Sequence, residues 1–148
     1  MYTIAATAKR GDMRLIAIVL GEKEGKVRNN ETMELLNYGF DNYKVDILKR
    51  KGEVIENVRL DMANKDNVSI VLDSDLTILS KKSDKSINYD FDVLINDIKL
   101  PLDENSKVGK INVIYNNKIV KSSPLIVKDK IYKVDYFNYL LSKFIMLF

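Results

Sequence analysis

The chain has 148 residues, 30% of them charged, and a formal net charge of +3, all ordinary for a globular protein. Because its basic residues are scattered rather than clustered, nucleic acid gains little support as a partner. The absence of cysteine and histidine excludes disulfides, thiol nucleophiles, imidazole bases and the usual zinc sites, so the sequence predicts no metal and no other cofactor.

Residues 3–21, TIAATAKRGDMRLIAIVLG, predict two strands joined by a tight turn at Gly11 and Asp12. Both strands are apolar on both faces, which is typical of strands in the middle of a covered sheet. Only one helix is predicted to follow them. We therefore expect the chain to begin inside a domain whose other layers are missing. The two faces of the second strand carry Met13, Leu15, Ala17 and Val19 on one side and Ile16, Ile18 and Leu20 on the other.

A helix is predicted over about residues 28–38. Asn29 or Asn30 would cap its start, and Glu31 would lie in the positive first turn. Gly39 is a plausible end. The apolar stripe that would cover one face of the hairpin consists of Met33, Leu35, Leu36 and Phe40.

From Tyr43 onward the apolar residues recur with a period of two instead of 3.6. The clearest run, residues 87–95, alternates apolar residues with Asn88, Asp90 and Asp92. The pair Asn116-Asn117 indicates a tight hairpin turn. Short alternating strands separated by turn residues predict an antiparallel, half-exposed β-domain that is sandwich-like.

The tail from residue 131 to 148 predicts an amphipathic helix, with apolar runs far shorter than the roughly 20 residues of a membrane span. From the residues alone, two interpretations stay open. The helix packs on the β-domain or on an oligomer partner, or it lies in a membrane surface beside Lys130, Lys133 and Lys143. Its apolar face consists of Phe137, Leu140, Leu141, Phe144, Ile145 and Phe148.

The runs AATAKRGDMRLI (5–16), VLG (19–21) and LLNYGF (35–40) together resemble the D-alanyl-D-alanine carboxypeptidases of the penicillin-binding protein family. The run VGKINV…NKIV…PLIV over 108–127 is similar to the family's C-terminal region. The resemblance implies an α+β, mostly β chain in three parts. Residues 1–41 would be a remnant of a transpeptidase-like peptidase domain, 42–128 the β-rich C-terminal domain, and 129–148 a helix held on the outer face of the cytoplasmic membrane.

The family's chemistry needs S-x-x-K, S-x-N and K-T-G motifs. No serine here has lysine three positions later, and K-T-G is absent. Ser86-Ile87-Asn88 matches S-x-N, but it follows the hairpin instead of preceding it, so we treat the match as chance. Arg28 stands where the family has an arginine that binds the substrate carboxylate. A solvated charge at a helix start is the equally weighted alternative.

The sequence thus predicts the C-terminal part of a serine-type carboxypeptidase that removes the terminal D-Ala from peptidoglycan stem peptides. Because the nucleophile is missing, no catalytic residue is predicted, and the chain is expected to be inactive alone. The alternative is a non-enzymatic, membrane-attached β-domain that acts as a spacer or binds a partner.

Overall fold

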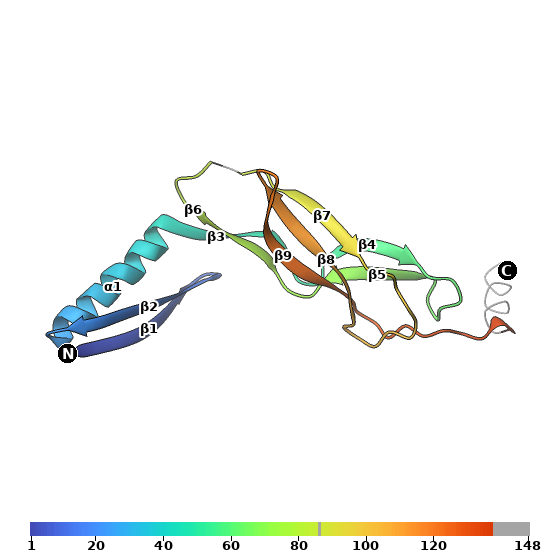
Figure 1. The fold of residues 1–148 in the computed structure, drawn as a ribbon, viewed down its shortest axis with the longest axis horizontal. Helices are drawn as coiled ribbons and strands as arrows, with labels where there is room; N and C mark the ends of the chain where they lie inside the picture. Colours follow the sequence, from blue (N-terminus) through green and yellow to red (C-terminus); the bar gives the residue numbers. More distant parts are fainter. Residues whose placement is uncertain (86, 138–148) are drawn as a thin grey trace. The chain divides into compact units, whose positions relative to one another are not determined.

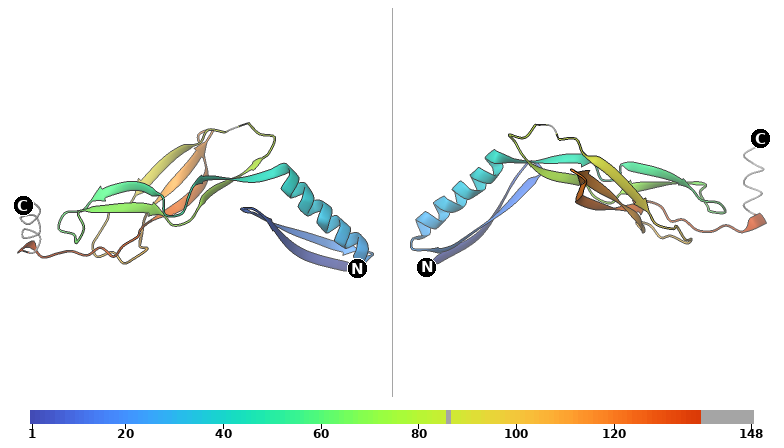
Figure 2. Two further views of the ribbon diagram at one scale, coloured as in Figure 1. Left: turned by 180° about the vertical axis from the view of Figure 1, so that it is seen from behind. Right: turned by 45° about the horizontal axis from the view of Figure 1, so that its top comes forward.

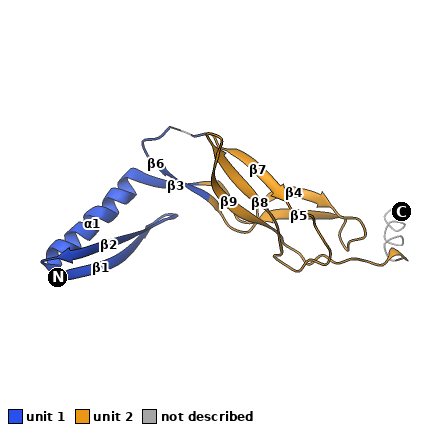
Figure 3. Cartoon of the chain, viewed as in Figure 1, with its two compact units in different colours: residues 1–46, 77–87 blue, residues 47–76, 88–148 orange. Residues whose placement is uncertain are grey.

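A computed structural model describes residues 1–85 and 87–137 of the chain. Its contacts divide into two compact units (Figure 3). Unit 1 comprises residues 1–46 and 77–87, and unit 2 comprises residues 47–76 and those from 88 onward. The chain therefore leaves unit 1, returns to it and leaves it again. The three domains inferred from the sequence, with boundaries after residues 41 and 128, stay a prediction.

Unit 1 contains the predicted hairpin, β1 (Tyr2–Arg10) and β2 (Met13–Glu22), paired antiparallel (Figure 1). The two-residue turn consists of Gly11 and Asp12, and Gly11 has φ +57°. A positive φ at the first central residue is what a type II′ turn needs, and glycine adopts it without strain. Met13 and Ala17 on one face of β2 are buried.

Helix α1 (Gly25–Asn42) lies along the hairpin in all views (Figures 1 and 2). It is longer at both ends than predicted, and the expected caps were wrong. The N-cap is Glu24, whose carbonyl accepts the Arg28 N–H at 3.1 Å. Asn29 and Asn30 therefore lie inside the helix, and Glu31 lies beyond its first turn. The first turn has no acidic residue.

Gly39 does not end α1, because the helix continues to Asn42. A Cβ added at Gly39 would lie 2.5 Å from the Leu15 Cδ1 of β2. The glycine thus allows close approach of helix and hairpin. The buried side chains of α1 are Thr32 and Phe40, whereas the predicted stripe residues Met33 and Leu35 are exposed.

Strands β3 (Tyr43–Lys49) and β6 (Leu76–Lys81) pair with each other as a two-stranded sheet. Within unit 1, the buried Ser80 hydroxyl donates to Asp46 Oδ2 at 2.5 Å, and Lys44 Nζ lies 2.8 Å from Asp46 Oδ1. The hydrogen bonds from Lys44 and Ser80 lower the pKa of Asp46.

We expect the Asp46→Asn variant to be less stable than the parent at pH 7 by about 0.5–1 kcal/mol, a small value because the carboxylate is partly solvated. The depressed folded-state pKa means that the contribution is present above the unfolded value of about 3.9 and is lost as pH falls through the folded value. Urea unfolding at pH 7 and at pH 3 checks this. The difference between parent and variant should shrink at pH 3, while the exposed Asp84→Asn variant should resemble the parent at pH 7. A difference that stays constant with pH would contradict the assignment.

Unit 2 contains one antiparallel sheet with the order β4-β5-β9-β8-β7 (Figure 1). These five strands join one sheet, because β9 pairs with β5 along one side and with β8 along the other. The strands β3 and β6 form a separate sheet among the described residues. The sandwich-like packing expected from the sequence stays a prediction. A period of two reveals which faces are buried but not which strands are neighbours. The strands are β4 (Val54–Arg59), β5 (Asn67–Leu72), β7 (Asp90–Ile95), β8 (Lys107–Tyr115) and β9 (Lys118–Val127).

The core of unit 2 gathers on the central strands. At the β8–β9 turn, Asn116 and Asn117 both have positive φ, at 50° and 58°, as a type I′ hairpin turn requires. This confirms the turn predicted there. The largest side chains with almost no exposure are Ile70, Leu72, Leu76, Ile111, Leu125 and Ile131.

The chain after β9 is extended where a helix was predicted. Leu102 and Ala63 form isolated β-bridges with Ile131 and Lys133, and helical backbone first appears at Tyr136. A helix from Ile131 would forfeit these bridges and expose a side chain that is only 1% exposed. Phe137 is 73% exposed. The remaining residues of the predicted apolar face lie outside the described residues: Leu140, Leu141, Phe144, Ile145 and Phe148.

Candidate functional site

Arg28 lies in the first turns of α1, and its guanidinium is held beside the start of β1. Nη2 and Nε donate to the Asn29 Oδ1 at 2.9 and 3.2 Å, and Nη1 lies 3.5 Å from the Thr3 carbonyl oxygen. The Tyr2 ring faces the guanidinium, with the ring centroid 5.8 Å from Cζ. These contacts orient a half-buried cation at one end of the hairpin.

Over the described part of the chain, no carboxylate lies within ion-pair distance of the Arg28 guanidinium. A planar guanidinium with a fixed orientation suits two-point recognition of a carboxylate. The sequence singled out Arg28 but missed its neighbours. Asn29 was misread as a helix cap, and no local pattern could place Tyr2 and Thr3, which are 25 or more positions away, against Arg28.

Two acidic residues lie near the same end of unit 1. Loss of solvent around Glu31 raises the pKa of its carboxyl group, and the nearby Glu22 carboxylate raises it further. Because Glu31 lies beyond the first turn of α1, it does not occupy the favourable position at the helix start that the sequence predicts.

The hairpin face opposite α1 is apolar and exposed. Ile16, Ile18 and Leu20 are 72%, 61% and 67% exposed. At the edge of the hairpin, an apolar cleft of about 290 Å³ opens between β2, α1 and Leu79 of β6, and Ile16 forms part of its wall. Contiguous exposed apolar surface of this kind marks an interaction site in soluble domains.

We expect the double variant Ile16→Thr/Ile18→Thr to bind less of a hydrophobic dye and to associate less with itself than the parent. Threonine keeps the β propensity of the positions, so the free energy of unfolding should change by no more than about 0.5 kcal/mol per site. Dye fluorescence and analytical ultracentrifugation measure both effects. Val54→Thr, at a residue 50% exposed in unit 2, is the matched control. Unchanged dye binding in the double variant would show that this face of the hairpin is not the surface that binds the dye.

Across residues 1–85 and 87–137, no group of three or more acidic side chains is arranged to hold a metal ion. Among the same residues, no helix combines the length and apolarity that crossing a bilayer requires.

Residues 43–133 match the sequence model of the family described as penicillin-binding protein 5, C-terminal domain. The chain belongs to this family. The penicillin-binding protein 5 match covers β3 to β9 and the extended segment that follows β9, and so includes all of the five-stranded sheet.

Curated relatives extend the similarity over nearly the whole chain. The D-alanyl-D-alanine carboxypeptidase DacF of Bacillus subtilis is 23% identical over 140 residues, which cover 94% of this chain and 36% of the relative. The D-alanyl-D-alanine carboxypeptidase DacC of Escherichia coli is 26% identical over 138 residues, 93% of this chain and 34% of the relative. The chain thus spans about a third of the length of these relatives.

Solved structures agree on the fold. Penicillin-binding protein 5 from Haemophilus influenzae superposes with a TM-score of 0.70 at 25% identity, covering 89% of this chain and 39% of that one. A peptidoglycan synthesis regulatory factor, PBP3 from Streptococcus pneumoniae, gives a TM-score of 0.63 at 17% identity and shares the fold. The resemblance inferred from the hairpin and helix sequences is confirmed.

Proposed function

We propose that this chain is the C-terminal part of a serine-type D-Ala-D-Ala carboxypeptidase, in which residues 1–41 complete the peptidase domain. The exposed apolar face of the β1–β2 hairpin carries the proposal. A hairpin that is apolar on both faces needs a second covering layer, on the side away from α1. The relatives named D-alanyl-D-alanine carboxypeptidases are about three times as long as this chain. The absent layer would come from the rest of the peptidase domain.

In the proposed whole enzyme, a serine attacks the carbonyl of the penultimate D-Ala of a peptidoglycan stem peptide. The terminal D-Ala leaves, and water hydrolyses the acyl-enzyme. This chain supplies no S-x-x-K and no K-T-G, so its part is to complete the wall of the site and to carry the β-domain. The purified chain should not be labelled covalently by a fluorescent penicillin. Labelling that survives denaturing electrophoresis would overturn the assignment.

Arg28 is the residue we assign to the terminal carboxylate of the stem peptide. In a chimera joining the catalytic part of the Escherichia coli relative to this chain, Arg28→Gln should lower kcat/KM for D-Ala release by about 10- to 100-fold, the usual effect of removing a charged hydrogen bond. Lys26→Gln, on the same helix, should leave it unchanged. Equal rates in the Arg28 and Lys26 variants would favour the solvated-charge interpretation.

The tail is proposed to hold the protein at a membrane surface. Exposed Tyr136 and Phe137, followed by the amphipathic sequence up to Phe148, suit an interface of lipid headgroups. The deletion that tests this should begin at Tyr136, because Ile131 is a core residue. The parent should float with anionic vesicles, and the deletion variant should not. Equal flotation would end the proposal.

A non-enzymatic spacer or partner-binding β-domain is the second candidate, favoured by the separate buried core of unit 2. It predicts that the hairpin is a stable part of the short protein. Hydrogen exchange as slow in residues 1–40 as in the sheet would support it over the enzyme fragment.

A further inference from the structure

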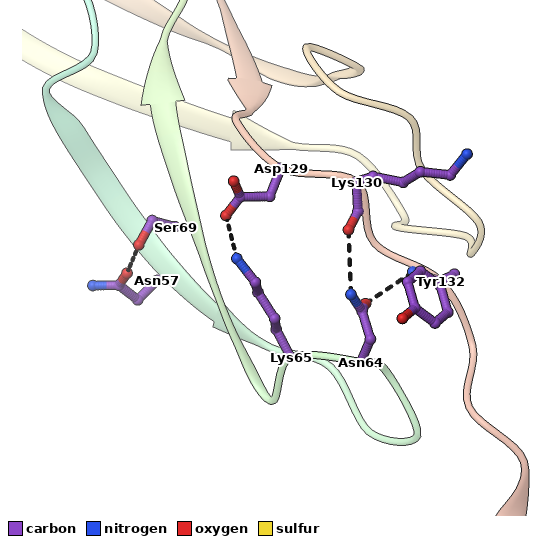
Figure 4. Close-up of polar contacts among 7 residues, drawn as sticks. All are labelled: Asn57, Asn64, Lys65, Ser69, Asp129, Lys130 and Tyr132. Atoms are coloured by element: carbon purple, nitrogen blue, oxygen red, sulfur yellow. Dashed lines mark hydrogen bonds and ion pairs between the residues drawn. The ribbon is translucent and has the colours of Figure 1, made fainter.

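The segment of residues 129–134, here called the tail base, runs between two loops of unit 2 (Figure 4). On one side lies the loop of residues 60–66 between β4 and β5. On the other lies Leu102, in the loop between β7 and β8. The tail base connects β9 to the proposed membrane-attaching residues, so its rigidity governs how the two move together.

Backbone hydrogen bonds hold the tail base from both sides. The Leu102 N–H donates to the Ile131 carbonyl at 2.7 Å, and the Ile131 N–H donates to the Leu102 carbonyl at 2.8 Å. From the opposite loop, the Asn64 N–H donates to the Tyr132 carbonyl at 3.0 Å. The Val134 N–H donates to the Met62 carbonyl at 2.9 Å. The tail base is therefore bonded like a short central strand.

Asn64 makes three of the contacts with the tail base. Besides its backbone N–H, its side-chain Nδ2 donates to the Lys130 carbonyl at 3.3 Å, and its Oδ1 accepts the Tyr132 N–H at 2.9 Å (Figure 4). One carboxamide thus uses its donor and its acceptor on the same stretch of backbone. Aspartate would lack the donor and would place a charge against a carbonyl oxygen.

Side chains reinforce the joint on both sides. Lys65 Nζ lies 2.6 Å from Asp129 Oδ2, and Lys130 Nζ lies 3.2 Å from Asp103 Oδ1. The lysine at 130 therefore already has a carboxylate partner within the domain. The side chain of Ile131, the next residue after Lys130, is buried and also holds the segment in place.

We propose that the tail base is a rigid joint, with Asn64 as its positioning residue, which fixes the direction in which the tail leaves unit 2. A free six-residue linker would instead let its ends vary over roughly 13 Å. The consequence for orientation on lipid rests on the proposed membrane attachment. Joined in this way, the five-stranded sheet would stand at a set angle to the bilayer instead of swinging from a tether.

The experiment is pulsed electron-electron resonance on the full 148-residue chain, without lipid, with spin labels at Lys121→Cys on β9 and Tyr136→Cys. The chain contains no native cysteine, so both labels are unique. We expect a narrow distance distribution in the parent. Asn64→Ala should broaden it at least twofold, and should speed exchange of the Ile131, Tyr132 and Val134 amides at least tenfold.

Asn57→Ala is the matched control, because the Asn57 Oδ1 also accepts a side-chain hydrogen bond, from Ser69 at 2.7 Å, within the β4–β5 pair and away from the tail base (Figure 4). It should leave both measurements unchanged. A broad distribution in the parent, or equal widths in the Asn64 and Asn57 variants, would overturn the joint. Vesicle flotation is scored separately, so that a rigid joint without lipid binding would refute only the membrane attachment.

Discussion

Leu125→Ala is expected to lower the free energy of unfolding of unit 2 by about 2–5 kcal/mol, the range for removing most of a buried leucine side chain. Leu125 is 0% exposed and lies in β9, opposite Leu72 of β5 and Gly109 of β8. The cavity would open where the two halves of the sheet meet, at a position flanked by paired backbone on both sides. Such a site has little freedom to collapse.

Urea unfolding followed by circular dichroism measures the effect, with hydrogen exchange of the β5, β8 and β9 amides as a second readout. Ile119→Ala is the control, because Ile119 belongs to the same strand but is 60% exposed. It should change the free energy of unfolding by no more than about 0.5 kcal/mol. Similar losses for the two variants would show that the core does not centre on β9.

Gly109→Ala should destabilise the same sheet by about 1–3 kcal/mol through overpacking. Gly109 pairs with Ile95 of β7 and with Leu125 of β9. A Cβ at this position would collide with the Leu94 carbonyl oxygen and lie 3.0 Å from the Ile95 Cα. These atoms belong to the backbone, so they cannot move aside without displacing β7. The strand register is also irregular between Lys107 and Gly109.

Lys110→Ala, at the next residue along β8 and exposed, separates the steric effect from any general weakness of the strand. The thermal midpoint should fall for Gly109→Ala and stay near the parent value for Lys110→Ala. A stabilised Gly109→Ala protein would mean that β7 is free to shift, and that the usual entropic advantage of alanine over glycine decides the outcome.

The sequence predicted well those features that local patterns determine. The turn at Gly11 and Asp12, the two-sided apolar strands and the Asn116-Asn117 turn each depend on neighbouring residues. The ends of α1 were harder to predict, because a glycine such as Gly39 is compatible with two different roles. Glycine is a common helix stop, yet here it lets α1 approach Leu15, and only the partner strand decides between these roles.

Long-range pairing could not be predicted in the same way. The alternation of β5 and β9 does not state that Leu72 faces Leu125. In the tail, the sequence predicts a helix from Ile131 onward. Backbone hydrogen bonds with Leu102 and Asn64 instead hold Ile131 and Tyr132 in an extended conformation. At the candidate site, Arg28 was found through resemblance, while its contact with Thr3 depends on how α1 packs on β1.

The return of residues 77–87 to unit 1 affects how the protein can be made. Leu79 lines the cleft beside α1, and the Lys82 N–H donates to the Asn42 carbonyl at 2.8 Å. On a ribosome, unit 1 therefore cannot be completed when residue 46 emerges. Synthesis at about 5–20 residues per second leaves it waiting roughly 2–8 s for residue 87. During that interval the wall of the cleft that Leu79 completes is open on the nascent chain.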